Sequence, residues 1–278
     1  MQIEEIIKND IINCEALDLT YLEFESKSYS QNTYGCFLKS FEIKDGIKYY
    51  YKVSNYDMYR NVFGYESINE YIVSRLLDVL KIEHLKYDLV YARIRVDNKE
   101  FNTYISVSEE FKSINERKEP FDNYYYVNRI DNESPIDFII RLGFKEYLYK
   151  MFFVDYVIFN RDRHGANVEI LISENGKIRM SPFFDHGLSL LLSDYNNEKY
   201  VNDYDIFKSE PTNSFFGTRS TYENLKFIED KNIIDNYTLT VNDFEYIFKN
   251  LNSIIPKFTI DKIIKFISER LKIWQNFQ

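Results

Sequence analysis

The sequence predicts an α+β fold with two lobes: a β-rich N-terminal lobe that contains one important helix, and a mainly helical C-terminal lobe. The chain has 278 residues, which is more than a single hydrophobic core usually serves. Short runs rich in β-branched and aromatic residues gather in its first part, whereas apolar residues at helical spacing dominate the remainder. We therefore expect an N-terminal lobe over residues 1–111 and a C-terminal lobe over residues 112–278.

The N-terminal lobe is predicted as several strands around one helix. Lys48–Val53 is a β-prone run, and Glu66–Leu80 has apolar residues that recur every three or four positions, which is typical of a helix. The segment Ser28–Phe37 contains one glycine and is expected to be a loop. Three further strands are expected around Tyr21–Glu25, at Tyr87–Val96 and at Phe101–Val107.

Helical patterns dominate the C-terminal lobe. Pro135 is expected to open a helix, and Tyr147–Phe159 is an apolar run of helical length that leads into a polar loop. Val168–Ile172 and Lys177–Met180 flank the turn-forming sequence Ser-Glu-Asn-Gly and predict a β-hairpin. Asn115–Glu133 is charged and irregular, so we expect a mobile connection there. Two final helices are expected at Val241–Asn250 and at Thr259–Trp274, the second with Thr259 as its N-cap.

Two polar segments carry the residues that we expect to perform chemistry. Asn160–Asn167 places Asp162 five positions before Asn167, and Phe184–Gly187 supplies Asp185. In phosphoryl-transfer enzymes this interval lets the Asp orient an attacking hydroxyl while the Asn holds magnesium, and Asp185 would be the second metal ligand. A surface loop rich in Asp, Asn and Gly is the alternative interpretation. The apolar segments that precede both loops favour a catalytic site.

A kinase also needs a lysine that holds the nucleotide phosphates and a helical glutamate that holds the lysine. Lys52 lies in a predicted strand among aromatic residues, and the helix that follows offers Glu70 and, one turn earlier, Glu66. The alternative interpretations are an ordinary lysine on an edge strand and glutamates on a solvated helix face. The order of these residues along the chain supports the kinase interpretation.

The motif Asn-x-Asp-Arg-His-x-x-Asn and the downstream Pro-x-Phe-Asp-x-Gly-x-Ser-Leu, here Pro182–Leu190, resemble the HipA-like Ser/Thr kinases of bacteria. The same Asp-Arg-His-x-x-Asn occurs in phosphoinositide lipid kinases. The resemblance covers the chain from about Ser28 to its C-terminal helices, but only the catalytic core is specific. It implies a protein-kinase-like fold, ATP and Mg²⁺ as cofactors, Asp162 as the residue that orients the nucleophile, and two metal ligands, Asn167 and Asp185.

The resemblance also implies which residues contact the nucleotide. Asn69-Glu70-Tyr71 is similar to the family's Asn-Glu-Tyr, which favours Glu70 as the partner of Lys52, with Glu66 as the alternative. By their order along the chain, Glu109, Glu110 and Phe111 correspond to the hinge whose backbone meets adenine. His164 is expected to support the catalytic loop beside the nucleotide rather than to accept the proton.

The segment Ser28-Tyr29-Ser30-Gln31 is similar to the family's phosphate-covering loop. It implies that Ser28, Ser30, Gln31 and Gly35 lie against the phosphates. In the family a serine of this loop can be autophosphorylated, which ejects the loop and silences the enzyme. Ser28 and Ser30 are both candidates for that modification, and the single glycine leaves less room for phosphate than a glycine-rich loop would.

Composition limits the partners and the compartment. A net charge of −9 disfavours direct binding to nucleic acid, because neutralising phosphates requires a basic face. Two cysteines cannot make a disulfide framework, and the sequence has neither a signal peptide nor an apolar run as long as a membrane span. We therefore expect a cytoplasmic protein without membrane contact.

In the HipA-like family such kinases are often toxins of toxin–antitoxin pairs that phosphorylate an aminoacyl-tRNA synthetase. The resemblance thus implies ATP, a protein substrate and an antitoxin partner. The chain is short for a full-length family member, and we expect it to lack the extra N-terminal subdomain, which some smaller relatives leave to a separate partner protein. Two other functions stay open: a lipid or small-molecule kinase, which Asp-Arg-His also fits, and a non-catalytic binding module with the kinase fold, which the glycine-poor loop also fits.

Overall fold

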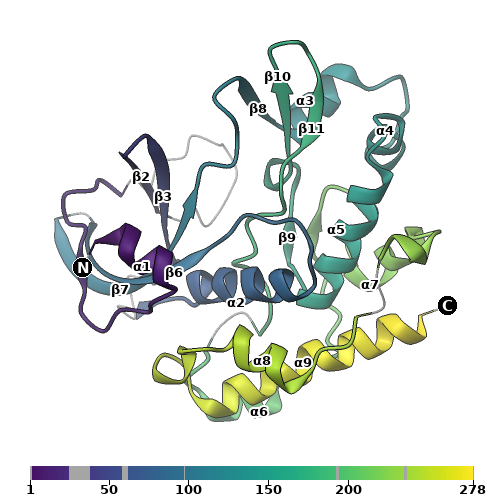
Figure 1. The fold of residues 1–278 in the computed structure, drawn as a ribbon. Coiled ribbons are helices and arrows are strands. Elements are labelled where there is room, and N and C mark those ends of the chain that lie inside the picture. Colours follow the sequence, from purple (N-terminus) through teal and green to yellow (C-terminus); the bar gives the residue numbers. More distant parts are fainter. Residues whose placement is uncertain are drawn as a thin grey trace.

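The computed structural model describes residues 2–24, 38–57, 62–96, 98–191, 194–234 and 237–277. Its N-terminal part contains a five-stranded sheet with the strand order β1-β6-β7-β3-β2 (Figure 1). All neighbouring pairs are antiparallel except β1 and β6. The strands are β1 (Leu17–Asp18), β2 (Lys39–Lys44), β3 (Ile47–Val53), β6 (Asp88–Val96) and β7 (Lys99–Glu109), and a separate pair is formed by β4 (Tyr56–Asp57) and β5 (Val62–Phe63).

Three of the predicted strands are confirmed as β3, β6 and β7. The prediction of a strand around Tyr21–Glu25 is wrong for residues 21–24, which are the part of this segment that the structure describes. The chain forms β1 earlier and then turns at Thr20 and Tyr21. Thr20 donates hydrogen bonds from its backbone N–H (3.0 Å) and its hydroxyl (2.7 Å) to the Asp18 side chain. Such an Asp-based turn ends the strand, and the sequence pattern alone did not reveal it.

The two faces of β2 and β3 have different surroundings, because side chains alternate along a strand. One face carries Tyr51 and Val53, which are fully buried in a cluster that includes Ile3 and Ile6 of helix α1 (Ile3–Asn9). The other face carries Lys52, and it lies opposite α1. This second face is the one that borders the candidate site described below.

Helix α2 (Glu66–Val79) runs between the sheet and the helices α8 and α9 (Figure 1). It confirms the predicted helix, and all its residues from Glu66 to Leu77 are buried. Its apolar residues belong to the same hydrophobic cluster as the C-terminal helices, not to the cluster on the sheet. The division of the chain at residues 111 and 112 stays a prediction.

The C-terminal part is mainly helical, as expected. The predicted hairpin is confirmed as β10 (Glu169–Ser173) and β11 (Ile178–Met180), which pair antiparallel. The long apolar run forms α5 (Lys145–Ile158), and Ser134 caps the helix that begins at Pro135. The remaining helices are α3 (Phe121–Asn128), α4 (Pro135–Arg141), α6 (Glu198–Asp203), α7 (Thr221–Asn224), α8 (Val241–Ile247), α9 (Lys257–Asn276) and the 3-10 turns η1 (Gly165–Asn167), η2 (Leu225–Phe227), η3 (Lys231–Ile233) and η4 (Leu251–Ser253).

Two expectations for this part are wrong. The segment 115–133 is not an irregular connection: it forms β8 (Glu116–Pro120), which pairs with β10, followed by α3. The pairing joins strands about fifty residues apart, which local patterns do not reveal. Thr259 is not an N-cap, because α9 begins at Lys257 after Pro256, and the buried Thr259 hydroxyl donates to the Tyr195 carbonyl at 2.5 Å.

Among the residues that the structure describes, no helix combines the length and the apolar character that a membrane crossing would need.

Candidate active site

The loop that follows α5 is held by its own side chains. Helix α5 ends at Ile158, and its C-cap Phe159 adopts a left-handed conformation with a φ of 51° that turns the chain out of the helix. The Asn160 amide then donates to the Asp155 carboxylate at 3.0 Å, and its oxygen accepts from the Asp162 N–H at 3.2 Å. These two hydrogen bonds fix the backbone at Asp162 relative to the helix.

Arg163 ties this loop to the segment that contains Asp185. The Arg163 guanidinium is buried, and it forms an ion pair with Asp155 at 2.8 Å. Its Nη1 atom donates to the backbone carbonyls of Asn167 (3.1 Å) and Phe184 (2.9 Å). A single buried cation therefore holds the chain at Asn167 and the chain just before Asp185 together. The sequence motif contains Arg163 but did not indicate this role.

Asp162 and Asn167 are oriented by different partners. The Asn167 amide nitrogen donates to the Asp162 carbonyl at 2.8 Å, so its side-chain oxygen points elsewhere. The Asp162 carboxylate accepts from Asn213 at 2.7 Å, because β12 (Asn213–Ser214) pairs in parallel with β9 (Asp162–Arg163). Asn213 lies 51 positions after Asp162, and no sequence pattern indicated it.

His164 lies in the same loop, and its contacts are local. Its Nδ1 atom accepts a hydrogen bond from the Ala166 N–H at 3.2 Å, and its Nε2 atom lies 3.8 Å from the Asp162 carboxylate. The first contact makes His164 the N-cap of η1, the short turn that carries Asn167. His164 thus supports the loop directly.

Lys52 lies between two carboxylates. Its ammonium is 2.5 Å from Glu70 Oε1, and it also contacts Asp185 Oδ1. The second oxygen of Glu70 accepts from the Ser106 hydroxyl at 2.5 Å. The Glu66 carboxylate has another role, because it accepts a hydrogen bond from the Asn55 N–H at 3.2 Å. The three predicted residues Lys52, Glu70 and Asp185 therefore meet at one place.

The charges of this cluster support one another. Burial opposes the charged form of Lys52, yet the carboxylates of Asp185 and Glu70 outweigh burial and raise its pKa. Burial also opposes the charged form of Asp185, but the ammonium groups of Lys52 and then Lys39 lower its pKa. Tyr87 was not predicted to belong to the site. Its hydroxyl accepts from the Asp185 N–H at 3.4 Å, and burial followed by the Glu70 carboxylate raises its pKa, so the phenol stays neutral.

Helix α2 also contacts the segment after Asp185. Asp185 has a φ of 60°, a left-handed conformation that turns the chain towards α2. The Asn69 amide donates to the carbonyls of Gly187 (2.8 Å) and Ser189 (3.2 Å), and its oxygen accepts from the Tyr195 hydroxyl. His186 is buried in this segment, where burial and then the Arg163 guanidinium lower its pKa and keep the imidazole neutral.

The predicted hinge lies at the end of β7. Glu109 is the last residue of this strand, and the Glu110 N–H donates to the Lys48 carbonyl at 2.9 Å. The Glu110 carboxylate accepts from the Tyr50 hydroxyl at 2.7 Å. The Phe111 ring stacks on Phe184 with a centroid distance of 5.8 Å, which brings the hinge next to the segment of Asp185.

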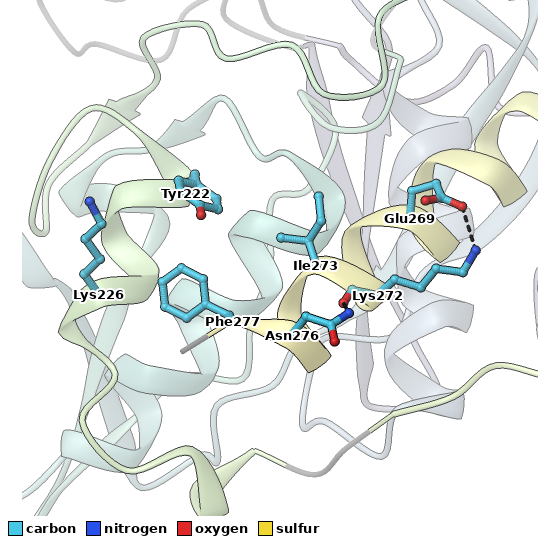
Figure 2. A pocket seen from close by; sticks show the side chains of 7 residues that line it. All are labelled: Tyr222, Lys226, Glu269, Lys272, Ile273, Asn276 and Phe277. Atoms are coloured by element: carbon cyan, nitrogen blue, oxygen red, sulfur yellow. Dashed lines mark hydrogen bonds and ion pairs between the residues drawn. The ribbon is translucent and has the colours of Figure 1, made fainter.

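The predicted phosphate-loop residues Ser28, Ser30, Gln31 and Gly35 lie outside the described residues. The described part includes two hollows of several hundred cubic ångströms. One, of about 540 Å³, lies between α2 and the hinge, and its lining includes Tyr87, Arg75 and residues 108–111. The other, of about 610 Å³, is an open groove beside the end of α9, and Figure 2 shows its seven lining side chains, which include Tyr222, Lys272 and Phe277. None of the predicted site residues lines that groove.

Comparison with known proteins identifies the fold. No family model and no curated protein matches the chain. Among solved structures it is similar to a proinflammatory kinase of Helicobacter pylori, CtkA, with a TM-score of 0.61 and 16% identity over 94% of this chain and 97% of the other. It is also similar to a HipA–HipB toxin–antitoxin complex with operator DNA from Shewanella oneidensis MR-1, with a TM-score of 0.43 and 14% identity over 99% of this chain and 69% of that one. The likeness to the first confirms the expected α+β kinase-like fold, and at this identity it concerns the fold alone.

Proposed function

We propose that this chain is an ATP-dependent, HipA-like kinase that transfers the γ-phosphoryl group to a serine or threonine of a protein. The observation that carries the proposal is the meeting of Lys52, Glu70 and Asp185, three residues from a strand, a helix and a loop, at one buried point. A buried lysine paired with two carboxylates is costly to build, because each charge loses its hydration. Functional sites are where charged groups with perturbed pKa values gather.

The proposed metal site consists of Asn167 and Asp185. The amide nitrogen of Asn167 is used by the Asp162 carbonyl, which leaves its oxygen as a donor for a cation. Carboxylate and amide oxygens suit Mg²⁺, which usually takes only one or two such ligands together with phosphate oxygens and water. When bound, the metal would neutralise charge on the phosphates during transfer. Arg163 supports the site, because it fixes the backbone of both ligand segments.

The proposed nucleotide site lies between the hinge and Lys52. Within the described residues the Phe111 N–H has no hydrogen-bond acceptor, so it is the candidate donor to the adenine ring. Glu109 and Glu110 border the same edge. Lys52 would bind phosphate oxygens while Glu70 holds its ammonium in place, and Asp185 would exchange its contact with Lys52 for the metal.

In the proposed reaction, the Asp162 carboxylate accepts a hydrogen bond from the substrate hydroxyl and orients its oxygen towards the terminal phosphorus. The new O–P bond forms as the bond from that phosphorus to the bridging oxygen breaks, so that ADP leaves and the hydroxyl proton passes to Asp162. The Asn213 amide holds the Asp162 carboxylate in place by donating a hydrogen bond to its Oδ1 atom. His164 keeps η1, and thus Asn167, in position.

The protein substrate and the partners are proposed from the motif resemblance. They comprise a protein with a target hydroxyl, for which an aminoacyl-tRNA synthetase is the first candidate, and an antitoxin partner. Autophosphorylation at Ser28 or Ser30 belongs to the same proposal. A lipid kinase is the second candidate function, because Asp-Arg-His also occurs in phosphoinositide kinases.

Incubation with labelled ATP and magnesium, followed by mass spectrometry, tests the proposal. Wild-type protein should label itself or a protein in added lysate, whereas phosphoinositide vesicles should stay unlabelled. Asp162→Ala and Asp185→Ala should each lower transfer roughly a hundredfold or more. Binding of Mg-ATP should fall only for Asp185→Ala. Asp131→Ala, which changes an exposed aspartate outside the site, is the control and should behave like wild type.

Two results would contradict the proposal. Turnover near the wild-type value after either change at Asp162 or Asp185 would remove the assigned roles. Label that appears only in the vesicles would replace a protein kinase by a lipid kinase.

A further inference from the structure

Strand β2 places a second lysine beside Lys52. Lys39 opens β2, and the register of the antiparallel pair sets its Cα directly opposite that of Lys52 on β3, the neighbouring strand in Figure 1. Directly opposite residues in such a pair point to the same face, with Cβ atoms about 4.5–5.5 Å apart. Because Lys52 reaches Glu70 and Asp185, that face borders the candidate active site. Lys39 therefore belongs to the same face as the site.

The two lysines differ in how their charges are compensated. Lys52 is buried between two carboxylates. Lys39 is exposed, and no ion pair or hydrogen bond of its ammonium occurs among the described residues. Like charges directly opposite on a sheet repel each other. An anion that lies against both ammonium groups would relieve this repulsion.

The local charge balance indicates what that anion is. Glu70 and Asp185 together outweigh the single charge of Lys52, so Lys52 alone brings no surplus positive charge to a polyphosphate. Lys39 supplies a further positive charge on the same face, and its ammonium forms no ion pair among the described residues. Phosphate oxygens form strong charge-assisted hydrogen bonds with lysine. We propose that Lys39 is a second phosphate-binding residue, which contacts the polyphosphate chain of the nucleotide. This inference rests on the proposed function.

An ordinary solvated lysine is the alternative, since lysines on edge strands also prevent sheets from pairing with each other. The same strand offers a matched control. Lys44 lies five positions further along β2, on the opposite face, where it forms ion pairs with Glu42 at 3.2 Å and Glu4 at 3.9 Å. A lysine that serves only solubility or edge protection should be replaceable at either position with the same result.

The test compares Lys39→Met with Lys44→Met by calorimetric titration with Mg-ATP, Mg-ADP and adenosine. Lys39→Met should weaken binding of ATP and ADP roughly tenfold, the loss expected for one charge-assisted contact, and leave adenosine unchanged. Lys39→Arg should retain most of the affinity. Lys44→Met should match wild type for all three ligands, and circular dichroism of each variant checks the fold.

The outcomes separate this inference from the proposed function. If wild-type protein binds Mg-ATP and Lys39→Met binds it equally well, the role of Lys39 is refuted while the kinase proposal stands. The same holds if Lys39→Met weakens adenosine as much as ATP, because the lysine would then act on the pocket and not on phosphate. If wild-type protein binds none of the three ligands, both proposals fail.

Discussion

Asn213 donates a 2.7 Å hydrogen bond to the carboxylate of Asp162, across 51 positions of sequence. The bond exists because β12 pairs with β9, so the segment after α6 reaches the loop that carries Asp162. It uses one oxygen of a carboxylate that has to present the other to a substrate hydroxyl. Asn213 is therefore a positioning residue in the proposed mechanism.

We expect Asn213→Ala to lower kcat roughly tenfold or more while leaving the affinity for Mg-ATP unchanged, because the bond orients Asp162 and touches neither the metal nor the nucleotide. Asn213→Ser, which can still donate, should recover part of the activity. Steady-state kinetics together with nucleotide titration checks this. Equal losses in kcat and in nucleotide affinity would indicate a structural role only.

Lys52 and Glu70 should act as a unit. Lys52→Met and Glu70→Gln should each lower kcat/KM by about tenfold or more, and the double variant should be little worse than the worse single change, because the two groups are in contact. Glu66→Gln is the control, since its side chain can still accept from Asn55. A silent Glu70→Gln beside a damaging Glu66→Gln would show that Glu66 holds the lysine. Breaking a buried pair costs about 3–5 kcal/mol, so the stability of each variant should be measured as well.

Gly165 should tolerate no side chain. A Cβ atom at this position would lie 2.4 Å from the Cβ of Asp122, a contact that requires the backbone to move. Gly165→Ala should destabilise the fold by about 1–3 kcal/mol and lower turnover, because η1 carries Asn167. Denaturant unfolding and kinetics check both effects.

The cause can be isolated at Asp122. On an Asp122→Gly background, which lacks the colliding atom, Gly165→Ala should cost much less. On an Asp122→Ala background, which keeps the Cβ atom at 2.4 Å but removes the Cγ atom at 2.8 Å, most of the cost should remain. Equal costs on the two backgrounds would refute the steric explanation.

Asp88 should make the stability of the folded protein depend on pH. Burial, followed by repulsion from Asp10, raises the pKa of Asp88 from 3.8 to about 7. A raised pKa means that the folded protein favours the protonated acid, so this contribution to stability is present below about pH 4 and is lost as the pH rises towards 7. Asp88→Asn cannot ionise, and it should melt at a higher temperature than wild type at pH 8.

That difference should shrink as the pH falls to about 4, where the wild-type acid is protonated. Asp131→Asn, at an exposed position, should track wild type throughout. Thermal unfolding at pH 4.5, 6 and 8 measures the effect. A wild-type protein as stable as Asp88→Asn at pH 8 would mean that Asp88 ionises without cost in the fold.

The sequence allowed prediction where a pattern is local. The strand of Lys52 and the helix of Glu70 follow from their periodicity, and the interval between Asp162 and Asn167 located the loop. The kinase-like fold followed from these motifs and their order. The residues of the phosphate loop stay predictions.

What could not be predicted depends on contacts between distant segments. Strand β8 was missed because its partner β10 lies far along the chain, and Asn213 was missed for the same reason. Arg163 was visible in the motif, yet its role depends on Asp155 in the preceding helix and on the backbone at Phe184. Tyr87 belongs to none of the sequence motifs. Its position beside Asp185 is a product of tertiary packing.

The hydrogen bonds of Asn69 have a consequence for how such an enzyme could be switched off. Asn69 joins α2 to the carbonyls of Gly187 and Ser189, and Tyr195 extends this connection to Thr259 in α9. An outward movement of α2 would separate Glu70 from Lys52. It would also leave these buried polar groups without hydrogen-bond partners and expose the apolar core that α2 shares with the C-terminal helices. We therefore expect α2 to keep its position when the protein changes between active and inactive states. Inactivation by moving a shorter, less buried segment would break far fewer interactions.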